Sequence, residues 1–196
     1  ARQDENMRRQ LEEIIGMPYK AKADVLNFLE IFSRPEMKRA CQEKMYRTLK
    51  GMKVACYYGC LTSRPVEVTG ASSTENPMEM DEIVALTGAE PVEWDFKTEC
   101  CGASHQVDAP KAARPLIERI IRNAKANGAQ AIITACPLCN LNLDMREGEI
   151  NKAKGTNYDL PVYQFTELLA VCMGAGAKDI GIHKHFFPAF DLLNEY

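Results

Sequence analysis

The feature that most constrains the fold is a regular alternation of short apolar runs with longer segments of helical periodicity. The apolar runs have the length of buried strands and lie at residues 52–58, 91–96, 129–135 and 160–165. Helical spacing of apolar residues is seen at residues 77–87, 109–127, 137–154 and 166–173. Strands that alternate with helices of this kind pair in parallel through right-handed crossovers. The sequence therefore predicts an α/β fold, with a short parallel sheet and flanking helices.

Residues 1–50 differ from the rest of the chain because their apolar patterns are all helical. Two such patterns precede Pro35, and a third helix is expected from Met37 to Lys50, with Gly51 ending it. We therefore expect a helical N-terminal segment, residues 1–50, before a cysteine-rich domain that covers residues 51–196. The third helix carries a basic face that would suit an acidic partner or would simply face solvent: Lys38, Arg39, Lys44, Arg47 and Lys50.

Charge and hydropathy exclude several classes of protein. The formal net charge is −3 and charged residues make up 26% of the chain, so nothing indicates nucleic-acid binding by phosphate neutralisation. No apolar run approaches the roughly 20 residues of a transmembrane helix. The chain opens Ala-Arg-Gln-Asp-Glu-Asn, with neither a secretory signal nor an initiator Met. We expect a cytoplasmic protein that is processed or is part of a longer chain.

Eight cysteines are the most unusual part of the composition, and five of them follow predicted strands. Cys60 follows the first strand, Cys100 and Cys101 follow the second, and Cys136 and Cys139 follow the third. The carboxyl ends of parallel strands share one edge of a sheet, where ligands bind. The helix N-termini at that edge favour anionic groups such as thiolates. In a reducing compartment, such a cluster indicates metal or redox chemistry rather than disulfides.

The number and spacing of these cysteines indicate the type of metal site. A structural zinc ion takes four ligands, usually from two knuckles of the Cys-x-x-Cys type. Five cysteines that include the adjacent pair Cys100 and Cys101 fit a multi-iron site better. Gly102 removes a side chain where the backbone turns close to the metal.

Three short motifs resemble those of a known family, the cysteine-rich CCG domain. They are Tyr57-Tyr58-Gly59-Cys60, Cys100-Cys101-Gly102-Ala103, and Cys136-Pro137-Leu138-Cys139 followed by Asn140-Leu141-Asn142-Leu143-Asp144. Over roughly residues 50–187 the chain is most similar to the second, C-terminal CCG domain of the heterodisulfide reductase B-subunit family. The resemblance implies a Rossmann-like CCG domain and a non-cubane [4Fe-4S] cluster. Its five ligands, carried over by motif position, would be Cys60, Cys100, Cys101, Cys136 and Cys139.

The resemblance also implies partners. The family's proteins normally have two CCG domains, whereas one set of motifs occurs here. The chain is thus expected to be either the C-terminal piece of a longer protein or a single-domain relative. The implied partners are a flavin-containing subunit and a ferredoxin-like iron–sulfur subunit of the same complex. The implied substrate is a small disulfide or thiol, or a sulfur carrier.

A few other polar residues are candidates for a role in the chemistry. His105 follows Gly102 closely, and because an imidazole titrates near neutral pH it would suit proton donation to a departing thiolate. A simple loop histidine is the alternative. His183 and His185 would ligate a metal or face solvent, and Asp144 and Arg146 would orient an anionic substrate or form ion pairs at the surface.

The remaining cysteines and two aromatic residues are interpreted as core residues, because they lie among apolar neighbours and match no motif position. They are Cys41, Cys56, Cys172, Trp94 and Tyr163.

Three functions are consistent with these residues and with the resemblance. The first is an enzyme subunit, an oxidoreductase that acts on sulfur groups and whose cluster passes electrons to or from a disulfide. The second is an electron-relay iron–sulfur subunit of a lactate-, glycolate- or succinate-type oxidoreductase, which binds no disulfide. The third is a structural zinc module with four ligands and no redox activity.

Overall fold

The computed structural model describes residues 4–106 and 108–196. Residues 1–3 of the predicted helical segment therefore lie outside the described residues. None of the helices within residues 4–106 and 108–196 has both the length and the hydrophobicity that a transmembrane span requires.

The sheet has four parallel strands, as the alternation of elements predicts. The strands are β1 (Lys53–Tyr57), β2 (Glu90–Pro91), β3 (Ala131–Thr134) and β4 (Val162–Gln164), in the order β2-β1-β3-β4. Val54 pairs with Ala131 and Tyr57 with Thr134, so β1 and β3 end side by side. The predicted α/β fold with a parallel sheet and flanking helices is confirmed.

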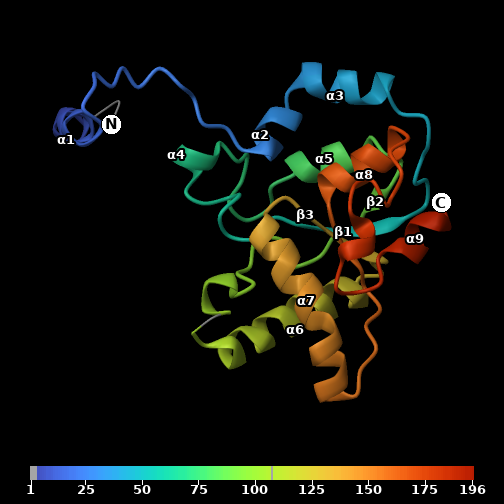
Figure 1. Cartoon of the computed structure of the whole chain (residues 1–196). Coiled ribbons are helices and arrows are strands. Elements are labelled where there is room, and N and C mark those ends of the chain that lie inside the picture. Colours follow the sequence, from blue (N-terminus) through green and yellow to red (C-terminus); the bar gives the residue numbers. More distant parts are fainter. Residues whose placement is uncertain (1–3, 107) are drawn as a thin grey trace.

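Helices cover both faces of the sheet (Figure 1). One face packs on α5 (Glu79–Ala85), α8 (Phe165–Cys172) and α9 (Phe190–Asn194), and the other packs on α6 (Pro110–Ala126) and α7 (Pro137–Lys154). The alternation of side chains along β1 serves both layers. Val54 and Cys56 are buried in the first core, whereas Ala55 and Tyr57 are buried in the second. Every residue of β1 after Lys53 is therefore buried in one of the two cores.

The second strand is much shorter than predicted. It comprises two residues, and the chain beyond Val92 lies beside β1 without continuing the ladder. Side chains and single backbone bonds replace the ladder. The indole Nε1 of Trp94 donates to the carbonyl of Cys56 at 3.2 Å, and the carbonyl of Lys97 accepts from the amides of Tyr58 and Gly59 at 2.8 and 3.1 Å. This segment leads directly to Cys100 and Cys101.

The N-terminal segment is less helical than predicted. Its helices are α1 (Glu5–Ile15), α2 (Phe28–Phe32) and α3 (Pro35–Glu43). Figure 1 shows α1 apart from the sheet, joined to α2 by an extended stretch. None of the residues of α1, all of which belong to the described part of the chain, is buried.

The predicted helix from Met37 to Lys50 is wrong beyond residue 43. The amides of Tyr46 and Arg47 both donate to the carbonyl of Cys172 at the end of α8, which draws this stretch out of a helix. The predicted basic face is divided as a result. Lys38 pairs with Glu82, and Arg47 donates to the Leu193 carbonyl. Gly51, with φ +88°, lies in the turn before β1 rather than at a helix end.

Two helix starts also differ from expectation. Asp108 directly precedes the helical pattern of residues 109–127, which predicts that it caps this helix. That prediction is wrong, because no side chain among the described residues caps α6; Ala109 occupies the cap position, with Pro110 in the first turn. Helix α8 begins one residue before the expected Thr166, because Gln164 and Glu167 form a reciprocal capping box. Shorter elements complete the chain: α4 (Val66–Thr69), η1 (Ala103–His105) and η2 (Ile182–Lys184).

The C-terminal segment is fastened to the second layer by a buried charge cluster. The carboxylate of Asp144 on α7 accepts from the amides of Phe186 and Phe187 at 2.9 and 3.0 Å. His185 Nε2 lies 3.0 Å from Glu167 Oε1 on α8, and His185 Nδ1 lies 3.9 Å from Asp144 Oδ2. The hydrogen bond to Glu167 raises the pKa of His185, against the opposing effect of burial. The fold therefore favours the protonated imidazole.

We predict that this attachment weakens as the pH rises. Because folding raises the pKa of His185 above its ordinary value near 6.5, its contribution is complete below that value and is lost as pH rises through the folded pKa. His185→Gln should therefore lower the free energy of unfolding by roughly 1–3 kcal/mol at pH 6, with a smaller deficit at pH 9. Urea unfolding of the wild-type protein and of His185→Gln between pH 6 and pH 9 measures the free energy of unfolding of each. His183→Gln, at an exposed position, is the matched control. A deficit for His185→Gln that is independent of pH would contradict this assignment.

Candidate metal centre

The five motif cysteines meet at the carboxyl edge of the sheet. Cys60 lies just beyond β1, Cys136 occupies the N-cap position of α7, and Cys139 lies in the first turn of that helix. Cys100 and Cys101 come from the segment that runs beside the end of β1. Cys101 and Cys139 are buried, Cys60 and Cys136 are half-buried, and Cys100 is exposed. The convergence expected from a parallel sheet is present in the structure.

Cys101 and Cys139 form the buried part of this group. Their sulfur atoms lie 3.6 Å apart, close to the roughly 3.8 Å that separates two thiolates on one tetrahedral ion with 2.3 Å bonds. The neighbouring Cys139 thiol lowers the pKa of Cys101 to about 6, with help from Asn142 and Tyr57 and against burial. The same contacts with Cys101 and Cys136 raise the pKa of Cys139. Cys139 thus keeps a proton between two neighbours that favour the thiolate form.

Cys136 gains further stabilisation from the start of α7. The Cys139 thiol, and then the backbone amides of Cys139 and Leu138, lower the pKa of Cys136 to about 6, although burial opposes them. The free amides and the positive end of the helix dipole favour an anion at this position. Cys136 is therefore poised to act as a thiolate ligand.

Cys60 and Cys100 form the outer part of the group. Burial raises the pKa of Cys60, and so does the nearby Cys100 thiol. The amide of Gly102 donates to the Cys100 sulfur at 3.3 Å. Electrostatic contacts link Cys60 to Cys100 and to Cys101, Cys101 to Cys139, and Cys139 to Cys136. All five thiols belong to one connected cluster.

The cluster is not arranged around a single point. Within residues 4–106 and 108–196, no three His, Cys, Asp or Glu side chains are placed to hold one metal ion. The donor chemistry fits an iron–sulfur group, because all five donors are thiols, and two of them have a pKa lowered to about 6.

Two glycines allow the backbone to pass this close to the sulfur atoms. Gly59 has φ +67°, and a Cβ there would lie 2.9 Å from the Cys139 sulfur. Gly102 has φ +72°, and a Cβ there would lie 3.0 Å from the Cβ of Ala113 on α6. Any side chain at either position would be strained by the backbone conformation and would also crowd a neighbour.

Two neighbours of Cys101 were not anticipated from the sequence. The Tyr57 hydroxyl donates to the carbonyl of Glu99 at 2.6 Å, and the amide Nδ2 of Asn142 donates to the carbonyl of Cys101 at 2.8 Å. Both also stabilise the Cys101 thiolate and so lower its pKa. The signal for Asn142 was its spacing three residues after Cys139, which puts both on one face of α7. For Tyr57 the only signals were its apolar strand and its place in the motif that ends at Cys60.

A buried ion pair supports the loops that carry Cys60 and Cys100. Lys97 Nζ lies 2.8 Å from Asp81 Oδ1, and the Tyr58 hydroxyl donates to Asp81 Oδ2 at 2.6 Å. Lys97 and Asp81 are only 3% and 4% exposed, so removing either charge leaves the other unpaired in the interior. Because the Lys97 carbonyl also holds the backbone before Cys60, this residue ties the first two cysteine loops together.

The structure places the polar residues that the sequence suggested in different surroundings. His105 is exposed at η1 and faces Asp108, with Nδ1 3.7 Å from the carboxylate. Asp144 is buried and occupied by the C-terminal segment, so it does not present a carboxylate to a substrate. Arg146 is partly buried, and its Nε donates to Gln106 Oε1 at 2.9 Å. His183 is exposed, whereas His185 belongs to the buried cluster with Asp144.

The predicted core residues are confirmed. All are at most 6% exposed: Cys41, Cys56, Cys172, Trp94 and Tyr163.

Comparison with known proteins gives the class of the chain. Residues 54–144 match the CCG family, whose description is "Cysteine-rich domain". This range contains all five clustered cysteines and both glycines that approach them. The chain is therefore a protein with a cysteine-rich CCG domain.

The full-length similarities are more specific. The chain is 32% identical over 181 residues to the B subunit of the ferredoxin/F(420)H(2)-dependent CoB-CoM heterodisulfide reductase of Methanosarcina acetivorans, over 91% of this chain and 60% of that protein. It is 28% identical over 173 residues to a protein of Archaeoglobus profundus that is named as similar to the heterodisulfide reductase B subunit, over 85% of this chain and 58% of that protein. The chain is therefore similar to heterodisulfide reductase B subunits over most of its own length and over about three fifths of theirs.

A third relative carries a different name. The 8-methylmenaquinol:fumarate reductase membrane anchor subunit of Wolinella succinogenes is 28% identical over 179 residues, which cover 90% of this chain and 62% of that protein. The chain thus spans about three fifths of the length of these relatives.

We predict that Gly59→Ala impairs the cysteine cluster. The new Cβ would be forced against the Cys139 sulfur in a left-handed conformation, at a cost of about 1–2 kcal/mol from the backbone alone. The free energy of unfolding in urea and the iron bound per chain should both decrease. Gly148→Ala is the matched control, because this helical glycine has open space around its Cβ position and should gain about 0.5–1 kcal/mol. Equal iron binding by Gly59→Ala and Gly148→Ala would contradict the close approach of residue 59 to the Cys139 sulfur.

Proposed function

We propose that this chain is an iron–sulfur subunit of a heterodisulfide reductase-like complex. In this proposal Cys60, Cys100, Cys101, Cys136 and Cys139 bind a non-cubane [4Fe-4S] cluster, and electrons pass to or from a disulfide or thiol substrate. The observation that carries the proposal is the single connected cluster of five thiols at the carboxyl edge of the sheet. We also propose that residues 1–50 link this domain to another part of the complex.

The donor set supports a group with several metal ions rather than a structural zinc ion. Zinc in structural sites takes four ligands in a tetrahedron, whereas five thiols gather here. The five come from three separate segments of the chain, and within the described residues no three of them are placed around one metal ion. A group of several ions can be reached by all of them.

The chain's own residues would bind the cluster, shield one side of it and leave another side accessible. When bound, the cluster would supply one-electron redox chemistry. Cys101 and Cys139 are buried against the sheet and α7, whereas Cys100 is exposed. Cleavage of a disulfide consumes two electrons and two protons and yields two thiols, so the site must be reached by substrate. The exposure of Cys100 supports sulfur chemistry at this edge.

A second candidate is an electron-relay subunit that binds no disulfide. The similarity to a subunit of a quinol:fumarate reductase supports it, because that protein's name refers to no disulfide. In either case we propose a flavin-containing subunit and a ferredoxin-like iron–sulfur subunit as partners. Addition of a small thiol to the oxidised protein separates the two candidates: the EPR spectrum should change for a disulfide-cleaving site and should not change for a relay.

We predict that each of the five cysteines is required for iron binding. Serine at any one of them should lower the iron bound per chain after anaerobic purification, because a hydroxyl does not replace a thiolate ligand. The matched control is Cys41→Ala, since Cys41 is buried, as Cys101 and Cys139 are, but lies in the core on α3. Circular dichroism checks that each variant keeps its fold. Full iron content in a folded variant would remove that cysteine from the ligand set.

We also propose His105 as the proton donor to a departing thiolate. Its side chain is 56% exposed, and its Nδ1 faces Asp108, so Nε2 is the nitrogen that would deliver the proton. His105→Gln should lower the rate of disulfide reduction about 100-fold, as is typical for loss of a general acid, without changing the iron content. His183→Gln should change neither quantity. An unchanged rate of disulfide reduction in His105→Gln would contradict this role and leave His105 as an exposed histidine without a part in the reaction.

A further inference from the structure

Glu147 is a buried carboxyl on α7, away from the cysteine cluster. The residue is 0% exposed, and the neighbouring side chains on its face of the helix, Leu143 and Ile150, belong to the second core. Its Oε1 accepts from the Leu160 amide at 3.0 Å, and its Oε2 is buried without a hydrogen-bond partner among the described residues. A negative charge at this position would be poorly solvated, so the surroundings favour the neutral carboxylic acid.

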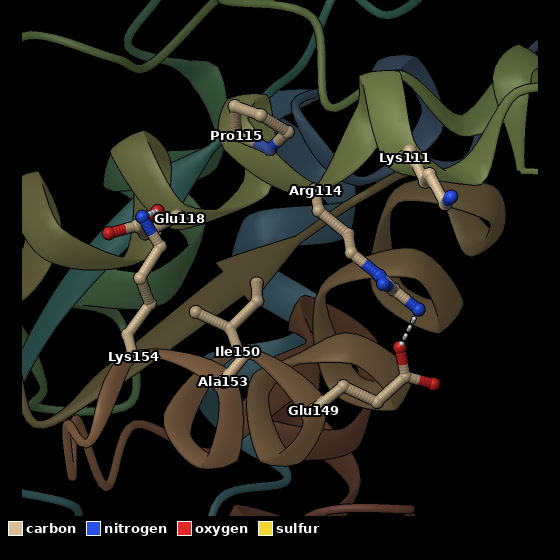
Figure 2. Close-up of a pocket in the computed structure, with 8 residues that line it drawn as sticks. All are labelled: Lys111, Arg114, Pro115, Glu118, Glu149, Ile150, Ala153 and Lys154. Carbon is tan, nitrogen blue, oxygen red and sulfur yellow. Dashed lines mark hydrogen bonds and ion pairs between the residues drawn. The ribbon is translucent and has the colours of Figure 1, made fainter.

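Carboxylates on the outer side of the same pair of helices have a different environment. Figure 2 shows Glu149 pointing toward Arg114 in the groove between α6 and α7, and Lys154 beside Glu118. The distance is 2.9 Å in the first ion pair and 3.4 Å in the second. In the part of the chain that the structure describes, no cation is placed in this way against Glu147. Its charge is therefore not compensated by a partner.

The charged groups that act on Glu147 come from two other elements. Asp159 lies in the loop before β4, and Lys125, on α6, donates from Nζ to the Asp159 carbonyl at 3.4 Å. Burial raises the pKa of Glu147 to about 7, and Asp159 adds to this effect, against the Leu160 amide, Asn151 and Lys125. The carboxyl therefore changes its charge near neutral pH, where an unperturbed glutamate with a pKa of about 4.3 is ionised.

Glu147 also lies within electrostatic reach of the cysteines. Cys139, Leu143 and Glu147 are four residues apart on one face of α7, and all three are buried. At a rise of about 1.5 Å per residue, Glu147 lies roughly 12 Å from Cys139 along the helix. Two charges at this separation, with an effective dielectric constant of about 20, change each other's equilibria roughly tenfold. An electron added at the cysteines would thus be sensed by this carboxyl.

We infer that Glu147 takes up a proton when an electron reaches the cysteine site, and the inference rests on the proposed function. The electron comes from the redox partner of the complex. The proton comes from solvent, which reaches the exposed Asp159 one residue before Leu160. The carboxylate becomes a neutral acid, so the added electron leaves the net charge of the domain unchanged. Glu147 acts through its charge, and it is a residue that couples reduction to pH rather than a catalytic residue.

The first experiment tests whether the folded chain holds Glu147 protonated. Urea unfolding compares the wild-type protein with Glu147→Gln, which mimics the neutral acid, between pH 5 and pH 9. Because folding raises the pKa of Glu147, ionisation destabilises the wild-type fold. The folding equilibrium constant of Glu147→Gln relative to wild type should therefore rise by up to about tenfold per pH unit and level off above about pH 7.

Glu149→Gln is the matched control, because it makes the same substitution two residues further along α7 at an exposed position. Its folding equilibrium constant relative to wild type should show no such rise. A ratio for Glu147→Gln that is independent of pH would overturn the inference, because it would mean that Glu147 is ionised throughout.

The second experiment tests the coupling to reduction. EPR-monitored redox titration of the anaerobically purified iron-containing chain gives the reduction potential between pH 6 and pH 9. The wild-type potential should become more negative as the pH rises above about 7, and Glu147→Gln should lose this part of the pH dependence. At pH 9 the two proteins should differ roughly tenfold in the equilibrium constant for reduction, which is about 59 mV for one electron. Glu149→Gln should keep the wild-type pH dependence.

Infrared difference spectra of the wild-type chain give a measurement that needs no variant. Reduction at pH 8 should produce the carbonyl band of a protonated carboxyl group, and this band should shift in D2O. Absence of the band, or equal pH dependence of the potential in wild type and Glu147→Gln, would overturn this inference and leave the proposed function in place. Absence of iron from the wild-type chain would overturn the proposed function and the coupling with it.

Discussion

The parallel register of β1 and β3 determines where everything else in this domain lies. Tyr57 at the end of β1 pairs with Thr134 at the end of β3, so the residues that follow these strands leave the sheet at the same edge. Cys60 and Cys136 are such residues, and they converge although they are far apart in sequence. The helix that starts at Cys136 then directs its amides and its positive dipole end at the thiols. An anionic sulfur site is thus a consequence of strand order.

The second pair of cysteines depends on a different kind of interaction. The regular hydrogen-bond ladder of β2 ends after two residues. Beyond it, the chain is held to β1 by hydrogen bonds from the Trp94 indole and to the Lys97 carbonyl. The buried pair between Lys97 and Asp81 contributes little net stability if both charges are present, but its loss would leave a charge buried alone. It therefore fixes one arrangement of the loop before Cys100 and Cys101, rather than simply adding stability.

The sequence predicted the sheet, α7 and the convergence of the five cysteines, because these depend on apolar periodicity and on the common edge of parallel strands. Residues 92–99 were missed because Trp94 and Lys97 are buried through individual hydrogen bonds, which leave no period in the sequence. The end of α3 was missed because the carbonyl of Cys172, distant in sequence, draws residues 46 and 47 away from a helix. Asn142 was missed because its role depends on the position of Cys101 across the site.

We propose that the five thiols bind one iron–sulfur cluster. The most direct test is a count of iron, acid-labile sulfide and zinc per chain after purification without oxygen, together with an EPR spectrum of the oxidised protein. If the five thiols hold one such cluster, about four iron and about four sulfide ions per chain should be found, together with a paramagnetic signal. One zinc ion per chain without iron or sulfide would contradict it.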